Sequence, residues 1–465
     1  MDDPIRLLPF VFVSQTTSRS PPPGTALELL YDSRFLSDRD FLPHLKPEPN
    51  QKMPWNFLAR TIAWLLLISA LWGETSSPVT LGSQPPGIVV AHQRSAHRQY
   101  IGSPSIARIG PSSLVASHDF FGPGSSFSVS TIHRSDDNGE SWSQIATIEE
   151  AFWSKLFVHR GALYFLGTTR EYGHAVIRRS DDGGYHWTHP VDRKQGLLLG
   201  EGEYHCAPMP VIEHQGRLWR AMEDRNPPKD WGKNFRAFVM SAAIDADLLD
   251  ADQWTISNRV AYNPDWGGTA WLEGNIVRDP QGKLWNLLRN HRSAPEKGCR
   301  LAISNDGHSI DFQPESGFFD LPGGSKKFSI LWDEVSQKYL ALANPCAPEF
   351  AARRPDQTRN ALALLSSPDL VHWDLRTILL YHPDVAVVGF QYPDWLIEGD
   401  QLLVLSRTAF PDPHGGPPNP HDANYLTFHR VENFRKRSLA DPPLGGHPTH
   451  PWMPDREKQE SSGRK

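Results

Sequence analysis

The chain has 465 residues, enough for one large domain or two ordinary ones. Its formal net charge is only −6 and it has no block of basic residues, which argues against a nucleic-acid partner. None of its three cysteines belongs to a Cys-x-x-Cys pair, and we expect neither a metal nor a cofactor. The 16 Trp, 35 Gly and 41 Pro predict many turns and short strands rather than helices.

The segment "MPWNFLARTIAWLLLISALWGETSS", which starts at Met53, has the pattern of a secretory signal peptide. Its apolar run, 61–72, is shorter than the ~20 residues of a membrane span. Because a signal peptide stands at the start of a protein, we expect 1–52 to be a gene-start artefact and 53–77 to be the removed peptide. The alternative is a genuine cytoplasmic extension before a membrane anchor. We therefore expect a secreted or periplasmic protein with no stable membrane span in its mature form.

Six β-hairpins repeat along residues 85–435. In each hairpin a turn leads into a short apolar strand, as in "RGALYFLGTTR", "QGRLWRAMED" and "GDQLLVLSRT", and a third short strand follows. Equivalent residues recur roughly every 50 to 65 residues, at Val115, Tyr164, Trp219, Trp285, Tyr339 and Leu403. Short strands with a period of this length are typical of a β-propeller. We predict an all-β fold of six blades in which neighbouring blades supply each other's core.

The last predicted blade has no convincing fourth strand of its own, so we expect residues 87–93 to return and close the ring. A ring of seven blades is an alternative if the long third repeat, 216–271, holds an extra unit. The tail, 436–465, is rich in Pro, Gly and charge and has no apolar period, which predicts disorder.

Two copies of the phrase Ser-x-Asp-x-Gly-x-x-Trp stand between the third and fourth strands of the first two blades, from Ser135 and from Ser180. The Ser and Asp side chains suit a turn because they accept backbone N–H groups, Gly takes a conformation that other residues avoid, and Trp packs on a neighbouring blade. Weaker copies begin at Ser304 and Ser367. These phrases resemble the Asp-boxes (BNR repeats) of the sialidase-like β-propeller superfamily over roughly residues 85–435. In that superfamily the boxes are structural and lie away from the catalytic face.

The resemblance implies positions for the catalytic residues. In "WLEGNIVRDPQGKLWNLLRNH", Glu273 takes the place of the family glutamate that activates a tyrosine nucleophile, and Arg289 that of an arginine that grips the substrate carboxylate. A second family arginine corresponds to Arg359 in "TRNALALLSSPDLVHW". The nucleophile corresponds to Tyr392 in "GFQYPDWLIEGDQ", where Phe390 fits the spacing nearly as well.

The acid/base aspartate of the superfamily corresponds to Asp119, which stands beside His118 at the end of a second strand. Sialidases open with an Arg-Ile-Pro phrase whose arginine completes the carboxylate site, whereas "YIGSPSIARI" has Gly102 at that place. This departure argues against sialic acid itself but not against an acidic sugar. Further substrate contacts are expected at the mouth of the funnel from Tyr204, His205, Arg220 and Arg407.

Three functions follow from these residues. The first is an exo-acting glycosidase for a terminal acidic sugar, in which Tyr392 attacks, Glu273 activates it, and Asp119 or His118 protonates the leaving oxygen. Another is a glycan-binding propeller without turnover. In all cases the expected partner is a glycan or an anionic polysaccharide, and the sugar, the linkage and the oligomeric state stay undetermined.

The remaining function is that of a uronate-polysaccharide lyase on the same propeller. Arg220 would neutralise the uronate carboxylate, Tyr204 would serve as the acid, and His118, His159 or His205 would abstract the proton at C5. A metal held by Cys206 beside His205 is a separate alternative to the expectation of no metal.

Overall fold

The structure is a computed structural model that describes residues 84–454. The expectations for 1–52 and for the signal peptide, 53–77, concern residues outside this range. Among the described residues no helix has both the length and the apolar character needed to cross a membrane.

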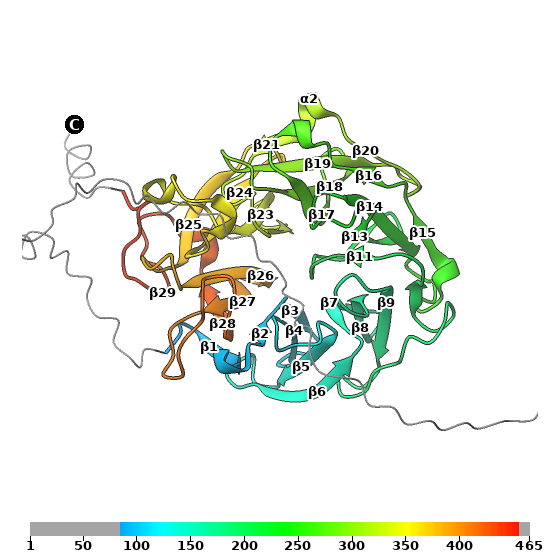
Figure 1. The fold of residues 1–465 in the computed structure, drawn as a ribbon, viewed down its shortest axis with the longest axis horizontal. Coiled ribbons are helices and arrows are strands. Elements are labelled where there is room, and N and C mark those ends of the chain that lie inside the picture. Colours follow the sequence, from blue (N-terminus) through cyan, green and yellow to red (C-terminus); the bar gives the residue numbers. More distant parts are fainter. Residues whose placement is uncertain (1–83, 455–465) are drawn as a thin grey trace, which may run out of the picture. The chain divides into compact units, whose positions relative to one another are not determined.

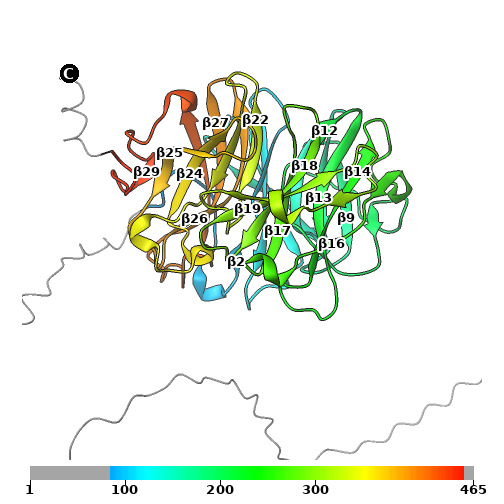
Figure 2. The same ribbon diagram turned by 90° about the horizontal axis from the view of Figure 1, so that it is seen from above.

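Six β-sheets surround a central axis, each as one blade (Figure 1), and Figure 2 shows the same ring from its side. The prediction of a six-bladed all-β propeller is therefore confirmed. The strands of the first three blades are β2 (Tyr100–Ile101), β3 (Ser105–Arg108), β4 (Leu114–Phe121), β5 (Val129–Ser135) and β6 (Ser143–Glu149); β7 (Phe152–His159), β8 (Ala162–Thr168), β9 (Ala175–Ser180) and β10 (Leu197–Leu199); and β11 (Tyr204–His205), β12 (Ile212–His214), β13 (Arg217–Arg225), β14 (Phe235–Ala243), β15 (Trp254–Ile256) and β16 (Val260–Ala261).

In every blade the strands named first lie nearest the axis and the later ones lie farther out. A one-turn helix, α2 (Pro314–Gly317), lies in blade four. Their strands are β17 (Ala270–Arg278), β18 (Leu284–His291), β19 (Lys297–Ile303), β20 (Ile310–Asp311) and β21 (Phe318–Asp320); β22 (Ser329–Asp333), β23 (Lys338–Ala343), β24 (Ala361–Ser367), β25 (Asp374–Tyr381) and β29 (Gly445–Gly446); and β26 (Gly389–Glu398), β27 (Gln401–Ala409), β28 (Tyr425–Glu432) and β1 (Ile88–His92).

The ring closes as the sequence predicted. Strand β1 pairs antiparallel with β28, with Ile88 opposite Phe428, so the first strand of the propeller completes its last blade. The long third repeat adds no seventh blade, because β15 and β16 both pair with β14 and extend blade three outward.

The tail differs from its prediction over its described part, 436–454. Strand β29 pairs in parallel with β25, with Gly445 opposite Leu380. Leu439 and Trp452 pack against the hydrophobic cluster between blades four and five. The composition of the tail wrongly predicted disorder for these residues, because backbone pairing and two apolar contacts do not require an apolar period.

Each pair of neighbouring blades shares at least one hydrophobic cluster. Between blades one and two, for example, Val115 and Ile132 pack with Leu156 and Phe165. A blade with two apolar faces is therefore stable only between neighbours, as in other repeat folds.

The two Ser-x-Asp-x-Gly-x-x-Trp phrases form the same turn. The Ser135 hydroxyl donates to Asp137 (2.7 Å) and accepts from the Gly139 N–H (2.7 Å), and the Trp142 indole N–H donates to the Gly139 carbonyl (3.0 Å). The phrase from Ser180 repeats these bonds in blade two. The Trp142 ring lies 5.6 Å from Phe428 of blade six, so the turn also joins neighbouring blades.

Buried histidines make the ring sensitive to acid. Burial lowers the pKa of His118 and of His429 to about 4, and burial together with the nearby His118 lowers that of His133 to about 3. The imidazole of an unfolded chain titrates near 6.5. Between about pH 6.5 and pH 4 the unfolded state therefore binds more protons than the folded state, and stability falls as the pH falls.

We expect the free energy of unfolding to be lower at pH 4.5 than at pH 7, with each histidine contributing on the order of 2–3 kcal/mol. Asp119 acts in the opposite sense and offsets about one of these contributions, because burial raises its pKa to about 6. Urea titrations at the two pH values measure the effect, and His429→Gln should reduce it. An equal pH dependence in the variant and the unmodified protein would place the acid sensitivity elsewhere.

Candidate active site

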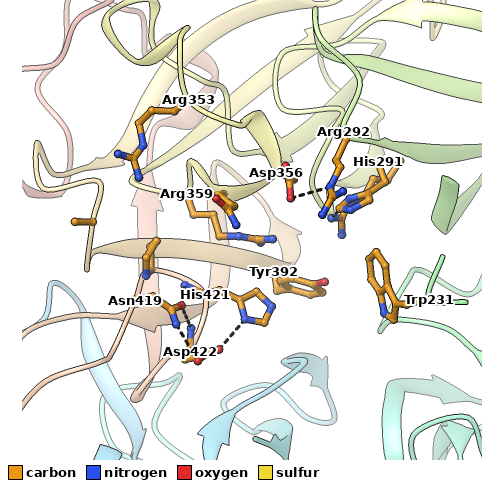
Figure 3. A pocket seen from close by; sticks show the side chains of 14 residues that line it. Trp231, His291, Arg292, Arg353, Asp356, Arg359, Tyr392, Asn419, His421 and Asp422 are labelled. Atoms are coloured by element: carbon orange, nitrogen blue, oxygen red, sulfur yellow. Dashed lines mark hydrogen bonds and ion pairs between the residues drawn. The ribbon is translucent and has the colours of Figure 1, made fainter. Parts of the chain in front are cut away.

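A cavity of about 600 Å³ opens at the end of the ring where the inner strands begin (Figure 3). Four arginines line it against two aspartates, which makes it suited to an anionic ligand. The lining residues are Trp231, Arg289, His291, Arg292, Arg353, Asp356, Gln357, Arg359, Ala386, Tyr392, Asn419, Pro420, His421 and Asp422.

Three inner strands carry an irregularity at this end. The pairing register shifts in β7, β17 and β26, and Trp153, Glu273 and Tyr392 have left-handed backbones there, with φ of 51°, 61° and 53°. A non-glycine residue in this conformation costs about 1–3 kcal/mol, and such residues gather at functional sites as well as in turns. Such bulges redirect side chains, and here Glu273 and Tyr392 meet although they lie far apart in the sequence.

The carboxylate of Glu273 is the centre of a buried hydrogen-bonded group. It accepts from the Tyr392 hydroxyl (2.7 Å) and from Nη1 of Arg289 (3.1 Å), while Arg289 Nε donates to the Ser325 carbonyl (2.9 Å). Burial opposes ionisation of Glu273, but Arg289, His205 and Tyr392 outweigh it, so its pKa lies below the usual value. Burial and the nearby Glu273 raise the pKa of Tyr392. An ionised carboxylate beside a neutral phenol is the arrangement in which the carboxylate can take the phenolic proton.

Two further guanidinium groups lie over the Tyr392 ring. The Arg359 carbon Cζ is 5.9 Å from the ring centroid and that of Arg407 is 4.7 Å away. Arg359 donates to the Gln391 side chain (2.8 Å), and Arg407 donates to the His421 carbonyl (2.6 Å). The cluster thus contains three arginines, counting Arg289, although Gly102 lacks the one that the sialidase pattern expects.

Asp119 lies beneath the mouth rather than in the cavity. It is 2% exposed, and its two carboxylate oxygens accept from the backbone N–H groups of Ser103 and Trp153, both at 2.7 Å. A Cβ atom on Gly102 would lie 1.6 Å from Asp119 Oδ1, so this buried carboxylate occupies the space that a side chain at Gly102 would need.

Besides Asp119, six predicted site residues do not line the cavity: Glu273 and Arg407, which contact Tyr392, and His118, Tyr204, Arg220 and His205. His118 points to the opposite face of β4 from Asp119, because side chains alternate along a strand, and it bonds the Thr131 hydroxyl (2.9 Å). The Tyr204 hydroxyl donates to the Glu201 carbonyl (2.6 Å), and Arg220 is fully buried and donates to the carbonyls of Met209 and Ala207.

His205 lies behind the cavity. Its Nδ1 bonds Glu223 (2.8 Å), and it is close enough to Glu273 to lower the pKa of that carboxyl. The neighbouring Cys206 thiol donates to the Trp153 carbonyl (3.4 Å). Within residues 84–454 no group of three His, Cys, Asp or Glu side chains has the arrangement of a metal site.

The lining residues that come from loops were not predicted from the sequence. Trp231, Asp356 and His421 lie on the connections from second to third strands in blades three, five and six. The signal was available in part, since these connections are long in the repeat alignment and emerge at the end where the inner strands begin. Which loop residues face the cavity depends on the closed ring.

The chain matches no protein-family model, and no curated protein matches its sequence. Among solved structures it resembles a Hadza microbial sialidase, with a TM-score of 0.51 and 14% identity over 74% of this chain and 68% of that one. It also resembles a Dyadobacter fermentans protein of unknown function, with a TM-score of 0.51 and 12% identity over 75% of this chain and 98% of that one. A third similar structure is a Fusarium graminearum GH93 α-L-arabinofuranosidase in complex with arabinobiose, with a TM-score of 0.50 and 11% identity over 75% of this chain and 98% of that one. Likeness at this identity concerns the fold, and this chain has the six-bladed β-propeller fold of the sialidase type.

Proposed function

We propose that this chain is an exo-acting glycosidase that removes a terminal acidic sugar from a glycan outside the cytoplasm. The observation that carries the proposal is the 2.7 Å hydrogen bond from the Tyr392 hydroxyl to Glu273, in a cavity that also presents Arg289 and Arg359. A nucleophile, its base and a pair of guanidinium groups then stand within reach of one sugar ring.

In the first step Tyr392 Oη bonds to the anomeric carbon, its proton passes to Glu273, and the bond from that carbon to the leaving oxygen breaks as an acid group gives that oxygen a proton. Water then attacks the same carbon and gives a proton back to the acid group, the bond to Tyr392 breaks, and Glu273 returns the proton to Tyr392. Arg289 and Arg359 hold the sugar carboxylate through both steps, since a planar guanidinium binds a carboxylate bidentately.

The elimination hypothesis has less support. It required Arg220, Tyr204 and one of three histidines to act on one uronate, and none of these residues lines the cavity. A binding protein without turnover needs the same anion site but gives no reason for the strained Glu273–Tyr392 pair.

The test is to incubate the purified protein with sialosides, uronate polymers and sulfated algal glycans. Hydrolysis releases a reducing sugar without a new ultraviolet absorbance, which is the expected result. An unsaturated product that absorbs in the ultraviolet would establish elimination instead. Binding of one of these glycans without any product would make the chain a lectin-like protein.

A further inference from the structure

The proposed hydrolysis needs a group that exchanges a proton with the leaving oxygen, and Asp119 is unsuited to this role. Both of its oxygens are occupied by backbone donors, and it does not line the cavity. A general acid must reach the oxygen that it protonates, directly or through one water molecule.

His421 is an imidazole that lines the cavity and is oriented by a carboxylate. Its Nδ1 bonds Asp422 Oδ1 at 2.8 Å, and the other Asp422 oxygen accepts from the Asn419 amide at 2.9 Å. Figure 3 shows its ring turned from Asp422 toward the Tyr392 side of the cavity. A carboxylate on Nδ1 fixes the tautomer and leaves Nε2 to exchange a proton with a ligand.

The loop that carries His421 is tied to the residues around Tyr392. The His421 carbonyl accepts from Arg407 Nη2 (2.6 Å) and from the Gln391 amide (3.0 Å), and the same amide donates to the Pro420 carbonyl (2.6 Å). The Phe121 ring packs edge-on against the imidazole, with centroids 5.3 Å apart. Contacts from three strands thus hold the imidazole in place.

We propose that His421, oriented by Asp422, is the acid and base of the proposed hydrolysis. In the first step Nε2–H gives its proton to the leaving oxygen as the glycosidic bond breaks. In the second step Nε2 takes a proton from the attacking water, which restores the starting state. This inference rests on the proposed function. It gives His421 the acid/base role that the sequence pattern assigned to Asp119.

The charges around His421 set its pH dependence. Burial, Arg407 and Arg359 lower its pKa to about 3, and the bond to Asp422 offsets only part of this effect. A substrate carboxylate on Arg359 offsets part of the arginine charge, so binding of an acidic sugar favours the protonated imidazole. The acid form is required for the first step, and kcat/KM should therefore fall as the pH rises through this pKa.

The experiment compares His421→Gln with the unmodified protein on two glycosides of the same acidic sugar, a 4-nitrophenyl glycoside and a methyl glycoside. We expect the variant to lose about 10²–10⁴-fold in kcat/KM on the methyl glycoside and less than about tenfold on the 4-nitrophenyl glycoside, whose leaving group needs no proton. Azide, a nucleophile that needs no base, should restore the breakdown of the glycosyl-enzyme in the variant. On the methyl glycoside, kcat/KM of the unmodified protein should decline with rising pH, and the residual kcat/KM of the variant should lack this decline.

A matched control is His372→Gln. His372 makes the same bond to Asp369 (2.7 Å) on the outer turn of blade five and should change neither rate when replaced. Equal losses on both glycosides, or no loss on either, would overturn the assignment of His421 while Tyr392→Phe still tests the glycosidase proposal by itself. If the unmodified protein cleaves neither glycosides nor natural glycans, both proposals fail.

Discussion

Replacement of Tyr392 by Phe is expected to abolish glycoside turnover, with a loss of at least ~10³-fold in kcat. The variant removes one oxygen, the atom that accepts the glycosyl group and donates to Glu273 at 2.7 Å. Glu273→Gln keeps the shape but removes the proton acceptor, and should lose about 10²–10⁴-fold. Initial rates on a 4-nitrophenyl glycoside of the acidic sugar measure both losses.

Tyr381→Phe is the matched control for this experiment. Tyr381 also donates to a carboxylate, Glu349, at 3.0 Å, but neither residue lines the cavity. The control should keep full activity. If Tyr392→Phe keeps its activity as well, the tyrosine is not the nucleophile and the proposed mechanism fails.

Replacement of Arg289 or Arg359 by Lys is expected to weaken the transition state by about 2–4 kcal/mol on an acidic glycan. Lysine keeps the charge but loses the planar fork that binds a carboxylate bidentately. Arg289 additionally donates to Glu273 at 3.1 Å, so its replacement should lower kcat as well as affinity. The measurement is kcat/KM on the acidic glycan and on its carboxyl-reduced form.

The carboxyl-reduced glycan separates recognition of the acid from general damage to the site. Selectivity for the acidic form should fall in both variants. Equal losses on the two forms would mean that these arginines do not bind the sugar carboxylate, and the proposed acidic substrate would be wrong. Arg435→Lys is the control, since Arg435 holds Asp333 with two hydrogen bonds (2.8 and 2.7 Å) outside the cavity.

Several residues of the site could be predicted from the sequence. Glu273, Arg289 and Tyr392 stand at fixed places in the repeat, near the start of an inner strand or the end of a second strand. A propeller brings those places together at one end of its axis, so the repeat alone predicts that these side chains meet. Asp119 and His118 also lie at such a place, yet Asp119 is buried against Gly102 and His118 points to the opposite face of its strand, where it bonds Thr131 of the same blade.

The sequence by itself determined the number of blades, the strand that closes the ring and the turns between third and fourth strands. These features follow from a period and from local hydrogen bonds, and both are written in consecutive residues. Only the tertiary structure decided which polar side chains reach the cavity. A bulge or a one-residue change of register turns a side chain to the other face. Loops of other blades, such as those with Trp231 and Asp356, meet Tyr392 only in the closed ring.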